Sequence, residues 1–137
     1  MKRKKYVYKI NLGDFDCLKS RYFLQVYEKL DIDKMRKCAK VFLGCHDFRN
    51  FVSGERDNYL MCVEDIKFNM NNDILEIEFL GKSFLRYMVR NMVGAMLEVG
   101  MHKKEICDVS KMLDDYMIKK QMMTAPACGL YLMDIEY

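Results

Sequence analysis

Two arginines, Arg86 and Arg90, have the residue type and spacing to bind an anion. If their segment is helical, they lie one turn apart on the border of an apolar stripe. A guanidinium there can bury its stem and present its planar fork to a carboxylate or phosphate in a groove. The pattern alone also fits two surface arginines whose stems only cover the core, and it favours that interpretation.

His46 and Asp47 place an imidazole beside a carboxylate, the residue types used in general acid–base catalysis. The pair follows Gly44, where a helix is expected to stop, and precedes Phe48. Asp-Phe after a helix stop is equally typical of local capping and packing. We therefore favour a structural role for both residues over a catalytic one.

The cysteines show no C-x-x-C pair and no ligand-like spacing with His46 or His102. We expect buried, reduced thiols in a cytosolic protein rather than zinc ligands or disulfides, and we expect no metal site. The six cysteines are Cys17, Cys38, Cys45, Cys62, Cys107 and Cys128.

Composition limits the class of protein. The 137 residues suffice for a single domain over 1–137, and the net charge of +3 is too small to indicate nucleic-acid binding by itself. The basic run at residues 1–5 fits a solvated terminus, a phosphate-contacting edge or an expression leftover. No secretory signal is visible, and charges interrupt the longest apolar segment, so we expect no membrane span.

Hydrophobic periodicity predicts the elements that must position these residues. It favours an α+β fold, with helices packed on one face of a mostly antiparallel sheet. A short turn or helical piece is expected at 46–52 and a hairpin turn at 71–73. Strands are expected at 4–12, 21–27, 61–70, 74–80 and 130–137, and helices at 31–43 with Asp31 as N-cap, at 83–100 and at 104–116.

The chain resembles a known family in four blocks. Residues 83–94, S-F-L-R-Y-M-V-R-N-M-V-G, closely resemble the signature helix of the TruA family of tRNA pseudouridine synthases. Three further blocks agree in type and order: K-K-Y-V-Y-K-I at 4–10, G-C-H-D-F at 44–48, and T-A-P-A-C-G-L-Y-L at 124–132. The resemblance spans essentially the whole chain and implies half of the pseudouridine synthase fold.

The resemblance implies an isomerase that converts uridine to pseudouridine in the tRNA anticodon stem-loop, without a cofactor. Tyr6 would stack on the flipped base, with Tyr8 on the same strand face as the less favoured candidate. Arg90 would position the catalytic aspartate by an ion pair, and Leu130 would form an apolar wall against the base. RNA contacts are expected from Lys4, Lys5, His46 and Arg86.

One required block is missing. The family's nucleophilic aspartate lies in an R-T-D-x-G-V-H-A segment of the preceding half, and this sequence has no such segment. The resemblance therefore implies the C-terminal half of a catalytic domain, from a truncated gene or a shortened protein, inactive without its N-terminal half. The chain also lacks the family's Arg-Thr before residue 61 and its arginine before Thr124, which puts tight tRNA binding in doubt.

Three function classes stay open. The first is the half-enzyme, a cytoplasmic protein with tRNA and the missing N-terminal half as partners. The second is a non-catalytic RNA-binding or assembly module that keeps the fold. The third and least favoured is a purely structural dimerisation domain: the family resemblance implies a homodimer, and an unpaired sheet edge would favour self-association.

Overall fold

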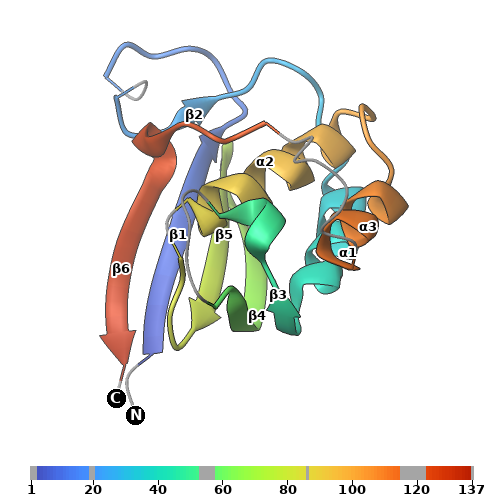
Figure 1. The fold of residues 1–137 in the computed structure, drawn as a ribbon. Coiled ribbons are helices and arrows are strands. Elements are labelled where there is room, and N and C mark those ends of the chain that lie inside the picture. The colour runs from blue at the N-terminus through green and yellow to red at the C-terminus, as the bar shows by residue number, and fades with distance from the viewer. Residues whose placement is uncertain (1–2, 19–20, 53–57, 86, 115–122, 137) are drawn as a thin grey trace.

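In the part of the chain that the structure describes, three α-helices pack on one face of a six-stranded sheet (Figure 1). The computed structural model describes residues 3–18, 21–52, 58–85, 87–114 and 123–136. The strands are β1 (Arg3–Asn11), β2 (Leu24–Gln25), β3 (Gly44–Asp47), β4 (Leu60–Asn71), β5 (Ile74–Gly81) and β6 (Leu130–Glu136). The helices are α1 (Ile32–Phe42), α2 (Met88–Gly100) and α3 (Ile106–Asp114), with 3-10 turns η2 (Arg49–Phe51) and η3 (Ala127–Gly129).

The sheet is built around β1. One edge of β1 pairs antiparallel with β5 from Lys4 to Asn11. Its other edge pairs antiparallel with β6 and then, at residues 10–11, parallel with β2. The path continues from β5 through β4 to β3. The expected α+β fold with a mostly antiparallel sheet is therefore confirmed.

The hydrophobic core lies between the helices and one face of this sheet. Alternate residues of β5, Leu75, Ile77 and Phe79, are buried, as strand geometry requires of a sheet covered on one side. Helix α2 is buried almost all round, which makes it the central helix of the packed layer. None of the described helices is long and apolar enough to cross a membrane.

Helix α1 follows local signals closely. Asp31 caps its N-terminus, since the carboxylate accepts a hydrogen bond from the Lys34 backbone N–H at 3.1 Å. The buried residues recur at helical spacing and are Met35, Cys38, Ala39 and Phe42. Gly44, with φ of +90°, follows the helix in a conformation that favours glycine.

Two expected elements differ in the structure. The strand predicted at 21–27 is only Leu24–Gln25, because β6 already occupies the edge of β1 at residues 3–8. Strand β3 was not expected: residues 44–47 pair with the first part of β4. The sequence pattern predicted a helix stop at Gly44 and a turn or helical piece at 46–52. Of that piece, only η2 is helical.

The start of the long helix also differs. Ser83 was expected to begin it, but α2 begins at Met88, after Tyr87 adopts a left-handed φ of 64°. Phe84 and Leu85 therefore belong to a connecting segment rather than to a helical stripe. Gly81 makes room for it, because a Cβ there would lie 3.1 Å from the Phe84 ring and 2.9 Å from a backbone oxygen of Cys62.

Candidate active site

A small pocket of about 160 Å³ brings the three predicted catalytic residues together. Tyr6 comes from β1, Arg90 from the first turn of α2, and Leu130 from the first position of β6. Complete small-molecule sites usually enclose roughly 300–1,000 Å³. The pocket thus has the size of part of a site. Its remaining lining residues are Phe84, Leu85, Tyr87 and Val89.

Tyr6 rather than Tyr8 is the tyrosine of the pocket. The half-buried Tyr6 ring meets Phe84 edge-on, with ring centroids 5.3 Å apart. Tyr8 is fully buried, and its hydroxyl donates a hydrogen bond to the Pro126 carbonyl at 2.6 Å. Burial raises the pKa of Tyr8 well above its ordinary value. Tyr8 thus supports the wall behind the pocket, and only Tyr6 of the two lines it.

Arg90 is held from two sides. Its Nε donates to the Ala125 carbonyl at 2.7 Å, and its guanidinium lies over the Tyr87 ring, 4.5 Å from the centroid. Within the described part of the chain, no carboxylate forms an ion pair with Arg90. The guanidinium is thus fixed in orientation while its charge is not neutralised by those residues.

Leu130 reaches the pocket through a close approach of two strands. It lies opposite Tyr8 in the β1–β6 register and is half-buried. Gly129, just before it, would place a Cβ 2.7 Å from the Lys9 carbonyl oxygen and 2.9 Å from the Tyr8 ring. Only glycine fits that contact, so Gly129 sets how tightly β6 starts against β1.

The structure separates the residues predicted to bind RNA. Side chains alternate along β1, so Lys4 shares the face of Tyr6, whereas Lys5 lies on the opposite face. There the Lys5 ammonium lies 3.6 Å from a Glu78 carboxylate oxygen. Arg86 lies outside the described residues, and α2 begins after it, so its expected position one helical turn from Arg90 has no support.

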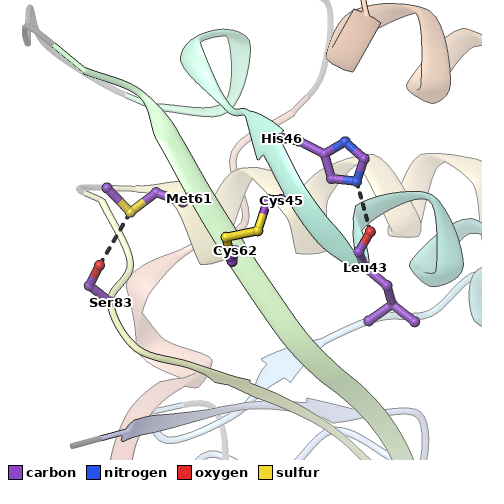
Figure 2. The surroundings of a disulfide bond; sticks show 6 residues. All are labelled: Leu43, Cys45, His46, Met61, Cys62 and Ser83. Atoms are coloured by element: carbon purple, nitrogen blue, oxygen red, sulfur yellow. Dashed lines mark hydrogen bonds between the residues drawn. A yellow bond between two sulfur atoms is a disulfide. The ribbon is translucent and has the colours of Figure 1, made fainter. Parts of the chain in front are cut away.

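His46 lies far from this pocket, on β3, three strands away from β1 or about 14 Å at ordinary strand spacing. Figure 2 shows its ring turned toward Leu43, and Nε2 lies 2.8 Å from that residue's carbonyl oxygen. The neighbouring Asp47 accepts hydrogen bonds from the backbone and the side chain of Arg49. Both residues thus make the local contacts expected of a capping and packing role.

The expectation of reduced, buried thiols is wrong for Cys45 and Cys62. They form a disulfide across β3 and β4, where they are direct partners in the strand register (Figure 2). Both cysteines are exposed, as are Cys17 and Cys107, and only Cys38 is a buried free thiol among the described cysteines. The spacing of 17 residues carries no signal of this pairing, because the contact depends on a strand that the sequence pattern does not predict.

We predict that reducing this disulfide destabilises the fold. The bond closes a loop with a sequence separation of 17, for which chain entropy implies a loss of about 3 kcal/mol on reduction. Urea unfolding with and without dithiothreitol measures the loss. The Cys45→Ser, Cys62→Ser double variant should match the reduced protein under both conditions. Equal midpoints for oxidised and reduced wild type would refute the stabilising role.

The buried Tyr8 hydroxyl predicts a stability loss in alkali. The unfolded chain releases this proton near the ordinary pKa of 10.0, while the folded protein retains it. Stability therefore falls as the pH rises above 10, by about 1 kcal/mol between pH 10 and 11. Tyr8→Phe lacks this loss, so its unfolding free energy should decline less over that interval. Parallel declines in both proteins would contradict the assignment.

Five described residues at or near the site were missed as site residues by the sequence analysis. Four of them line the pocket, namely Phe84, Leu85, Tyr87 and Val89. Helical periodicity assigned Phe84, Leu85 and Val89 to a core stripe and gave no signal for Tyr87. Leu132 lies opposite Tyr6 on β1 and is 51% exposed. The alternation of a strand could have identified it, since it lies two residues beyond Leu130 on the same face.

The described residues contain no group of histidine, cysteine, aspartate or glutamate side chains that could hold a metal ion. What the pocket offers instead is an aromatic ring, an apolar wall and a guanidinium. This set suits a planar, uncharged ring next to an anionic group.

Comparison with known proteins identifies the family. The family model described as tRNA pseudouridine synthase matches residues 38–137. Relatives called tRNA pseudouridine synthase A are 38% identical over 138 residues in Dictyoglomus thermophilum and 42% identical over 112 residues in Pseudothermotoga lettingae. These matches cover 99% and 80% of this chain, but 56% and 46% of the relatives.

A third relative, tRNA pseudouridine synthase A 1 of Clostridium tetani, is 35% identical over 140 residues, covering 100% of the chain and 57% of the relative. The chain thus spans about half the length of the curated relatives it matches. The match of the family model to most of the chain establishes the assignment. This chain belongs to the tRNA pseudouridine synthase family.

Proposed function

We propose that this chain provides the C-terminal half of a pseudouridine synthase active site acting on uridine in the tRNA anticodon stem-loop. The reaction is an isomerisation. The bond between uracil N1 and ribose C1′ breaks, a bond between C5 and C1′ forms, the C5 proton leaves, and N1 takes up a proton. Atoms and electrons balance without an oxidant or a cofactor.

The three pocket residues divide this task in a defined way. Tyr6 stacks on the flipped uracil, since an extruded base needs an aromatic or apolar surface in exchange for its lost neighbours. Leu130 closes the pocket with an apolar wall. The neighbouring Phe84, whose ring edge meets Tyr6, keeps the tyrosine ring from rotating away. The detached uracil is thereby held while it turns to present C5.

The orientation of Arg90 is the observation that carries the proposal. Its guanidinium is fixed by Ala125 and Tyr87, lines the pocket and has no carboxylate partner within the described residues. It is therefore suited to receive a carboxylate from another segment. We assign that partner to a nucleophilic aspartate of the N-terminal half. The ion pair would hold the aspartate ionised and aimed at the sugar or base.

The same proposal covers the extent of the domain, its partners and its RNA contacts. We propose one half-domain over residues 1–137, tRNA and the N-terminal half as partners, a homodimeric assembly, and a cytoplasmic location. Lys4 is the better RNA-contact candidate of the two lysines, because it shares the face of Tyr6. Lys5 is paired with Glu78 on the other face, and His46 is on a different strand edge.

Tritium release from tRNA labelled at C5 of uridine separates this function from a non-catalytic RNA-binding module. This chain joined to its proposed N-terminal half, called the full-length protein below, should release tritium with multiple turnovers, because each isomerisation expels the C5 hydrogen. Salt-sensitive tRNA binding without any release would support the RNA-binding module and overturn the enzymatic proposal.

A further inference from the structure

Residues 123–126 form a short strap that packs along helix α2 and leads through η3 into β6. It makes a hydrogen bond to α2 at each of three consecutive residues. The Met123 backbone N–H donates to a Glu98 carboxylate oxygen at 2.6 Å, and the Ala125 N–H donates to the Arg90 carbonyl at 3.1 Å. Between them, the Thr124 hydroxyl donates to Oδ1 of Asn91 at 2.6 Å. The strap thus follows α2 over about two turns.

Asn91 is the buried anchor of this strap. Its side chain is 0% exposed, and its amide uses both ends: Oδ1 accepts from Thr124, and Nδ2 donates to the Phe51 carbonyl at 2.9 Å. A buried amide is costly unless both groups are paired. Asn91 therefore joins η2, α2 and the strap at one point that tolerates few alternative arrangements.

The strap in turn fixes two sides of the pocket. Arg90 and Ala125 exchange two hydrogen bonds, because the carbonyl of Ala125 also accepts from Arg90 Nε at 2.7 Å. One residue further, the Pro126 carbonyl accepts from the buried Tyr8 hydroxyl. Any shift of the strap along α2 therefore rotates the guanidinium and changes where Leu130 begins β6.

We propose that Thr124 and Asn91 are positioning residues for the reaction, acting through the strap to set the orientation of Arg90. Neither residue lines the pocket, so neither touches the base directly. The inference rests on the proposed function for its catalytic consequence. Its structural consequence, the fixed Nε–H bond of Arg90, can be measured separately.

Thr124→Val tests the proposal, because valine keeps the shape of threonine and removes only the hydroxyl. In the full-length protein, kcat should fall by about 30-fold with KM within about twofold, since misplacement of a catalytic group by about 1 Å can cost on the order of a hundredfold. Thr124→Ser should restore kcat to within about threefold of wild type, because serine returns the donor. The Arg90 Nε–H signal in ¹⁵N-edited NMR should exchange with solvent about tenfold faster in the valine variant.

Asp31→Ala is the control. The Asp31 side chain also makes one structural hydrogen bond, accepting from the Lys34 backbone N–H at 3.1 Å, but it caps α1 and belongs to neither the strap nor η2. It should lower the melting temperature while leaving kcat and the Arg90 signal unchanged. An equal kcat loss in this control, or an unchanged Arg90 signal in Thr124→Val, would overturn the positioning role. A wild-type protein that forms no pseudouridine would refute the proposed function instead, and the NMR signal would still decide whether the strap orients Arg90.

Discussion

Arg90→Ala is expected to lower kcat of the full-length protein by about 10³-fold or more, with tRNA affinity within about threefold of wild type. Removing one preorganised electrostatic group from an active site typically costs a factor of roughly 10²–10³. On the proposed role of Arg90, the loss would also free the aspartate of the N-terminal half to rotate away from the reacting atoms. Single-turnover tritium release measures the chemical step, and filter binding measures the affinity.

Two further variants sharpen this test. Arg90→Lys keeps the charge but loses the planar fork that Ala125 and Tyr87 hold, so it should recover little of the rate. Arg36→Ala removes the same charge from an exposed position on α1 and should leave kcat unchanged. If Arg90→Ala weakens tRNA binding as much as it lowers kcat, Arg90 binds RNA rather than positioning an aspartate.

Gly94→Ala should destabilise the protein by about 3 kcal/mol and release the strap from α2. A Cβ at Gly94 would overlap the Met123 backbone oxygen. Overpacking against a backbone group costs typically 1–3 kcal/mol and occasionally more, and it exceeds the roughly 1 kcal/mol that alanine gains over glycine in a helix. Urea unfolding measures the stability, and kcat should fall with it because Met123 leads directly into Thr124.

Gly100→Ala in the same helix provides the comparison. There the added Cβ would meet the flexible side chain of Met35 at 2.8 Å, which can move aside at small cost. Its stability should stay within about 1 kcal/mol of wild type. A Gly94→Ala protein as stable as Gly100→Ala would show that the strap is not packed directly on α2.

The elements that sequence predicted well depend on local signals. Helix α1 has its aspartate cap and its apolar spacing, and the β4–β5 hairpin has a turn in which Asn72 takes a positive φ of 55°. Strand β2 was predicted too long and strand β3 was missed, because they pair only two and four residues with another strand. Nothing in the local pattern specifies those pairings.

The site shows the same division between local and non-local information. The family resemblance identified Tyr6, Arg90 and Leu130, and the structure brings them to one pocket, while their catalytic roles stay predictions. Phe84 was not recognised, because the left-handed Tyr87 that separates it from α2 leaves no trace in hydrophobic periodicity. The sequence could have shown that Lys5 lies on the opposite face of the sheet from Tyr6, since neighbouring residues of a strand point to opposite faces.

Tritium release by the 137-residue chain, alone and with the N-terminal half added, shows where the nucleophile lies. We expect no release from C5-labelled tRNA by the chain alone at high concentration, and release once the half that carries the aspartate is supplied. Release by the chain alone would mean that one of its own aspartates performs the chemistry, with Asp47 the first to be replaced. That result would contradict the assignment of the pocket around Arg90 as half of a shared active site.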